Sequence, residues 1–70
     1  MSIDLTHQQW KELSKEAGGV YAYLNIKLTA ERITRMTGAK SWYIPPGNFP
    51  WITFHFDDPA KETFFRLKYL

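Results

Sequence analysis

Cysteine is absent from this chain of 70 residues, and no apolar run approaches the roughly 20 residues that a membrane-spanning helix needs. Without cysteine no disulfide can stabilise the fold, and its absence fits a reducing compartment. The N-terminus also lacks the basic and apolar regions of a secretory signal. These absences predict a cytoplasmic protein.

Residues that carry chemistry are scarce as well. The two histidines, His7 and His55, have no second ligand at metal-binding spacing. No glycine-rich loop precedes a predicted helix, as a phosphate-binding loop would. Asp57 and Asp58 stand before a proline, which is typical of a turn rather than of a catalytic pair. The sequence therefore predicts that the protein is not an enzyme and holds neither a metal ion nor a cofactor.

Aromatic residues, in contrast, are abundant: five Phe, four Tyr and three Trp make up 17% of the chain. Each ring buries about 150–250 Å² when it is packed, so the rings must supply much of the stability of a small domain without disulfides. They are also more than one small core can enclose. We therefore expect several rings to remain at the surface.

The first predicted element is a helix at residues 7–17. Thr6 is placed to cap it, and Gln9 completes a capping box three residues later. Leu5 and Trp10 form a predicted hydrophobic staple, and Trp10 also begins an apolar stripe at helical spacing. We expect Trp10 to be buried between this helix and a sheet.

The next segment alternates apolar and polar residues over 20–28, which predicts a strand with one face on the core. Thr29 is then placed to cap a second helix. Gly38 is expected to end that helix in a left-handed conformation, which glycine adopts readily.

The C-terminal half predicts three further strands, at 41–44, 51–56 and 63–69, with a stiff proline-rich loop at 45–50. The last two strands would form a hairpin whose inward residues are Ile52, Phe54, Phe56, Phe65, Leu67 and Tyr69. The element order α-β-α-β-β-β predicts one α+β domain over 1–70, with helices packed on a mainly antiparallel sheet.

Three surfaces are candidates for binding. The proline-rich loop and the outward strand face supply rigid rings beside cations, where interface energy concentrates. The residues predicted to bind a partner there are Trp42, Phe49, Trp51, Arg66 and Lys68. An alternative surface on and beyond the second helix carries Arg32, Arg35 and Lys40.

The third surface is the outward face of the predicted sheet, where rings alternate with cations. Its outward residues are Tyr21, Tyr23, Lys27, Trp51, Thr53, His55, Phe64, Arg66 and Lys68. Such a face can stack bases and neutralise phosphates. A nucleic-acid-binding domain is therefore the alternative function.

In size, lack of cysteine, α+β pattern, aromatic content and absence of an active-site motif, the chain resembles small bacteriophage proteins that bind and reprogram host RNA polymerase. The resemblance is one of general build over the whole chain and transfers no functional residues. It implies a regulator in the host cytoplasm that docks on a host protein such as RNA polymerase and inhibits or redirects transcription. Much ring surface and a net charge of only +2 favour a protein partner over nucleic acid.

Overall fold

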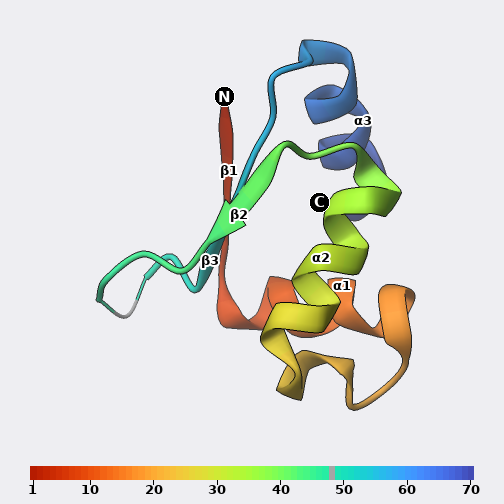
Figure 1. The fold of residues 1–70 in the computed structure, drawn as a ribbon, viewed down its shortest axis with the longest axis vertical. Helices are drawn as coiled ribbons and strands as arrows, with labels where there is room; N and C mark the ends of the chain where they lie inside the picture. The colour runs from red at the N-terminus through yellow and green to blue at the C-terminus, as the bar shows by residue number, and fades with distance from the viewer. Residues whose placement is uncertain (48) are drawn as a thin grey trace.

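A small antiparallel sheet is covered on one side by helices in the computed structural model, which describes residues 1–47 and 49–70 (Figure 1). The elements are β1 (Ser2–Leu5), α1 (His7–Gly18), the 3₁₀ helix η1 (Ala22–Leu24), α2 (Ile26–Thr37), β2 (Ser41–Tyr43), β3 (Ile52–His55) and α3 (Pro59–Tyr69). The prediction of an α+β domain with helices on an antiparallel sheet is confirmed. The predicted order of the elements is wrong.

The strand order in the sheet is β1-β3-β2, so that the last strand in sequence lies in the middle. Ile3 and Trp42 both pair with Phe54, from opposite sides. Paired residues lie on one face of a sheet, and this face points to the helices. On the other face, the Thr53 hydroxyl donates to Asp4 Oδ1 at 2.9 Å.

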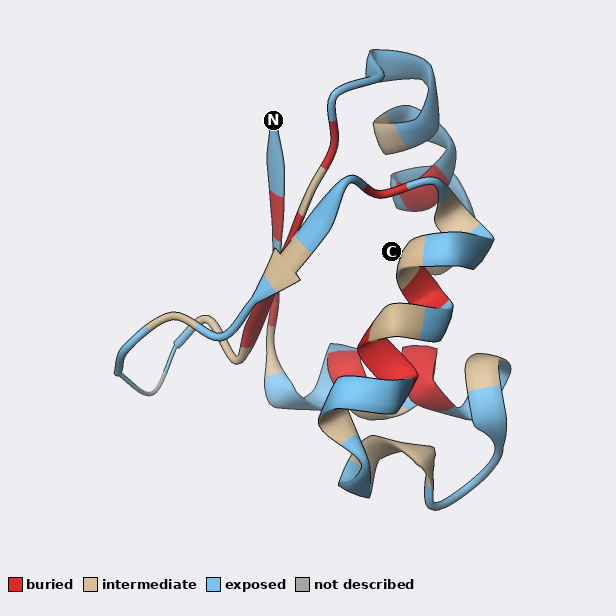
Figure 2. Cartoon of the chain, in the orientation of Figure 1, coloured by how far each residue is buried: buried red, intermediate tan, exposed pale blue. Residues whose placement is uncertain are grey.

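The core lies where α1, α2 and α3 meet the inner face of the sheet, as the buried segments in Figure 2 show. Trp10 is fully buried, which confirms the prediction, and its ring stacks on Phe54 at a centroid distance of 6.4 Å. Its indole N–H donates to the Tyr23 carbonyl at 3.2 Å, so that its polar atom is satisfied. Both bonds of the predicted capping box between Thr6 and Gln9 are present.

Residues 20–28 form no strand, and this prediction is wrong. They contain η1 and the start of α2, whose first turn is capped by Asn25 rather than by Thr29. The alternation of apolar and polar residues suggested a strand, but Ala30 and Ile33 continue an apolar stripe at helical spacing. Burial of these two residues favours the helix over the strand. The end of the helix at Gly38 is confirmed, with a left-handed φ of 77°.

The predicted strand at 63–69 is also wrong, because these residues lie in α3. Asp58 caps this helix by accepting from the Ala60 N–H at 2.9 Å, and Pro59 occupies its first turn. Phe65 is buried as predicted, but Leu67 is 81% exposed. The predicted hairpin therefore does not form, and β3 pairs instead with β1, which the sequence pattern did not predict.

Candidate functional site

The five residues predicted to bind a partner lie on three parts of the molecule. Trp42 is in β2, Phe49 and Trp51 are in the connection to β3, and Arg66 and Lys68 are in α3. The described parts of the connection project to one side of the sheet, while α3 packs on the other (Figure 1). The structure therefore does not bring these five side chains into one surface.

The two rings near β3 differ in their surroundings. Phe49 is 66% exposed, whereas Trp51 is partly buried and meets the His7 ring edge-on at a centroid distance of 4.8 Å. The Trp51 indole N–H is buried and has no hydrogen-bond partner among the described residues. Trp51 thus packs against α1, and Phe49 is the ring of this pair that is open to a partner.

Phe64, Arg66 and Lys68 are exposed around the outside of α3, and we name these three residues together the α3 surface. Arg66 Nη2 lies 3.4 Å from Glu62 Oε1, one turn earlier in the same helix. Lys68 Nζ lies 5.3 Å from the centroid of the Tyr69 ring and 5.9 Å from that of Phe64. These cations are already engaged on the outside of a single helix.

A more distinctive arrangement lies between α2 and β2, where a cavity of about 310 Å³ opens to solvent. Its lining residues are Glu31, Thr34, Arg35, Lys40, Ser41 and Trp42, which we name the α2–β2 cleft. The cleft combines Arg35 and Lys40 of the alternative surface with Trp42 of the predicted binding residues. Arg32 does not line it.

Gly38 places the two walls of the cleft side by side. Its left-handed backbone ends α2, with the Gly38 N–H donating to the Thr34 carbonyl at 3.0 Å. The chain then reverses, Ala39 is buried, and the Lys40 N–H donates to the His55 carbonyl at 2.7 Å. As a result, β2 runs back beside α2 (Figure 1).

The cleft lies at β2, which is an edge strand of the described sheet. Ser41 and Trp42 are neighbours in a strand, so their side chains point to opposite faces. The cavity touches both residues and α2, and β2 has one edge that faces away from β3. That edge carries no partner strand in the described sheet, because β2 pairs only with β3.

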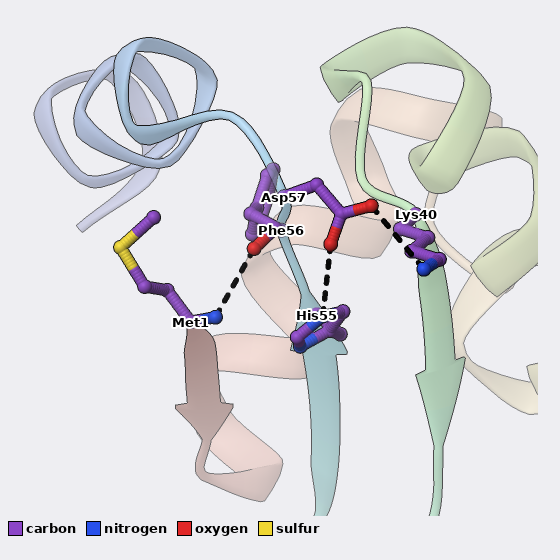
Figure 3. A network of polar contacts seen from close by, with 5 residues as sticks. All are labelled: Met1, Lys40, His55, Phe56 and Asp57. Atoms are coloured by element: carbon purple, nitrogen blue, oxygen red, sulfur yellow. Dashed lines mark hydrogen bonds and ion pairs between the residues drawn. The ribbon is translucent and has the colours of Figure 1, made fainter.

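The two basic side chains of the cleft differ in whether they already have an ionic partner among the described residues. Lys40 Nζ lies 3.3 Å from Asp57 Oδ2, and His55 Nε2 lies 3.2 Å from Asp57 Oδ1 (Figure 3). The hydrogen bond from Lys40 is the main cause that lowers the pKa of Asp57 below its ordinary value. Arg35 is exposed and makes no ion pair within the described part of the chain, so it is the cation more available to a ligand.

Sequence reasoning did not single out Glu31, Thr34 or Ser41 as site residues. The spacing of Glu31 and Arg35 would have placed both on one side of a helix, since residues four apart are neighbours there. The second helix predicted between Thr29 and Gly38 already contained Glu31, Thr34 and Arg35. The sequence did not show that this side of the helix meets Ser41, because that meeting depends on the packing of two elements.

Metal sites, membrane-spanning helices and similarity to known proteins also bear on function. No group of three or more His, Asp or Glu side chains gathers there as a metal ion would require. No helix in the described part is long and apolar enough to cross a membrane. Comparison of the chain with protein-family models, curated proteins and solved structures gave no match.

Proposed function

We propose that this chain is a non-enzymatic domain that binds another protein through the α2–β2 cleft. The observation that carries the proposal is the cavity of about 310 Å³ that joins Arg35, Lys40 and Trp42 beside an unpaired strand edge. An aromatic residue and an arginine in a concave site are the types enriched among residues that dominate binding energy. The unpaired edge adds backbone donors and acceptors to the same site.

A protein partner suits the molecule better than nucleic acid. The alternative function depended on a sheet face of rings and cations, but Tyr23 lies in η1, Lys27 in α2, and Phe64 and Arg66 in α3. That continuous sheet face is therefore not formed. The lining of the cleft mixes Glu31 with Arg35 and Lys40, so it is not the uniformly basic surface that binding of a phosphate backbone favours.

The resemblance to small bacteriophage regulators supplies the first partner to test. We rank bacterial RNA polymerase first on that resemblance, with inhibition or redirection of transcription as the expected consequence. Binding to purified polymerase should persist at moderate salt if apolar contacts and hydrogen bonds dominate. Binding to DNA or RNA would weaken steeply as salt rises.

One experiment compares the three surfaces directly. The tagged chain is used to capture proteins from a bacterial lysate, beside single variants of the cleft (Arg35→Glu), the α3 surface (Arg66→Glu) and the loop (Phe49→Ala). All three residues are exposed, so each variant should fold, which a thermal melt checks. We expect only Arg35→Glu to lose the captured protein. Loss in either other variant, with capture retained by Arg35→Glu, would move the site away from the cleft.

A further inference from the structure

We infer that the occupant of the α2–β2 cleft is an extended peptide segment, which adds as a fourth strand to the open edge of β2 and sets an acidic side chain against Arg35. The inference rests on the proposed function, because it specifies what part of a partner protein fills the same cleft. Three independent features carry it: the strand edge, the size of the cavity and the placement of its charges.

The strand edge supplies the backbone bonds. In an antiparallel pair, only alternate residues direct their N–H and C=O groups to the neighbouring strand, and the rest point the other way. Because β2 pairs with β3 on one side only in the described sheet, its remaining groups point away from β3 and have no partner strand there. An extended peptide that pairs with such an edge is a recurrent mode of recognition, in which backbone bonds give affinity and side-chain pockets give specificity.

The size of the cavity favours a peptide over an enclosed small molecule. Its volume of about 310 Å³ is at the lower limit of cavities that hold small ligands, about 300–1,000 Å³, and it is open to solvent. Such a space can take one or two side chains of a chain that continues beyond it. The three residues of β2 likewise match a short run of strand pairing rather than a whole domain surface.

The charges fix which side chains the segment brings. Arg35 is free of an ion pair among the described residues, and Lys40 lies beside it with Asp57 as partner. A guanidinium binds a carboxylate through two parallel hydrogen bonds, so an acidic side chain is the best match at this end. Glu31 stands one turn earlier in α2 and also lines the cleft, so beside it an uncharged side chain is preferred over a second acidic one.

Strand geometry turns this placement into a sequence pattern. Side chains two residues apart lie on the same face of a strand, so the acidic residue and the apolar residue that meets Trp42 should be separated by one position. Because the chain runs from Lys40 through Ser41 to Tyr43 of β2, an antiparallel peptide would place the apolar residue first. The expected pattern is apolar-x-acidic, and the reverse order would indicate parallel addition.

The first test is a selection of short random peptides, displayed on phage, against the full chain. We expect enrichment of extended peptides with the apolar-x-acidic pattern in either order. A synthetic copy of an enriched peptide should bind Arg35→Glu about 10- to 100-fold more weakly, as expected for a lost charge-assisted hydrogen bond. Arg32→Glu, on the same helix but outside the cleft, should bind it as the wild type does. A failure to enrich such peptides, or equal binding to Arg35→Glu, would overturn the inference.

The second test reads the backbone pairing. The enriched peptide is N-methylated in two versions, each at one of the two alternating sets of residues. Since only one set donates to β2, one version should lose about tenfold or more in affinity and the other should bind nearly as before. Equal tolerance of both versions would show that no strand is added and would overturn the inference.

The outcomes also separate this inference from the proposed function. If Arg35→Glu abolishes capture of the partner protein but no peptide pairs with β2, the cleft binds a folded surface and only the peptide inference fails. If Arg35→Glu leaves capture unchanged, the proposed function fails as well.

Discussion

The α2–β2 cleft and the α3 surface each combine two basic side chains with an aromatic ring, but they differ in construction. The cleft has walls from two elements, which reach the core through Ile33 and through the inward face of β2. The α3 surface lies on the outside of one helix, which is anchored by Phe65 and Tyr69. Its arginine is already paired within the helix, at 3.4 Å from Glu62.

This difference indicates that basic and aromatic composition alone does not make a recognition site. Rings and cations on a convex helix remain solvated, and an ion pair within one helix turn, such as Arg66 with Glu62, contributes little to stability. Two elements that meet at an angle enclose a space that a ligand can fill. The following experiments test whether the two regions differ in the way the structure shows.

The largest loss of stability is expected at Trp10, a core residue on which both the α2–β2 cleft and the α3 surface depend. Trp10 is fully buried against Phe54, so Trp10→Ala should destabilise the fold by about 3–5 kcal/mol. A domain of this size has little more stability than that to lose, and both surfaces should disappear together. Thermal denaturation followed by circular dichroism measures the effect. A cooperative melt within a few degrees of the parent would contradict the observed core.

A comparison within α3 tests which face of this helix is anchored. Phe65 is fully buried and Phe64 is 62% exposed. Phe65→Ala should cost about 3 kcal/mol, whereas Phe64→Ala should stay within about 0.5 kcal/mol of the parent. Urea denaturation of both variants gives the two values. Similar losses at the two positions would mean that α3 packs in another orientation and that the α3 surface is not as described.

Gly38 connects the two regions, because the side chain of Lys61 in α3 lies over it. A Cβ added at Gly38 would stand 2.5 Å from Lys61 Cδ, and the φ of 77° disfavours any L side chain. Gly38→Ala should destabilise the fold by about 1 kcal/mol, mainly through backbone strain, since the lysine stem can move. Addition of Lys61→Ala separates the two causes in urea denaturation. If Gly38→Ala stabilised the chain, α2 would have to continue through this position.

The smallest effect concerns the rim of the cleft. The bond from Lys40 lowers the pKa of Asp57 in the folded state, so this carboxylate stabilises the fold above its ordinary pKa of about 3.8. That contribution is lost as the pH falls through the lowered value. Melting temperatures of the parent and of Asp57→Asn should differ slightly near neutral pH and converge in acid. A difference that grew in acid would contradict the assigned direction.

Parts of this fold were readable from sequence because the signals were local. The capping box of Thr6 and Gln9 and the left-handed glycine at Gly38 act within a few residues. The strand at Ile52–His55 showed a clear alternation next to a loop rich in proline. In each case one short stretch contained the whole physical cause.

The errors arose where distant packing chose between two local patterns. Residues 20–28 fit the alternating pattern of a strand. In the structure, however, the Thr29 hydroxyl donates to the Ala22 carbonyl at 2.7 Å and Ile33 is buried, and both features belong to the helical arrangement of this segment. The C-terminal segment has the ring-rich composition of a strand, but Asp58 followed by proline was an available signal for a helix start. The cleft was not predicted because it depends on the meeting of α2 and β2, which no single segment specifies.

We propose that a partner binds at the α2–β2 cleft and not at the α3 surface. Amide hydrogen exchange of the full chain, alone and with its captured partner, tests this most directly. We expect slower exchange in the complex at Lys40 and over β2 (Ser41–Tyr43), with little change over residues 63–69 of α3. Slower exchange confined to α3, with β2 unchanged, would contradict it.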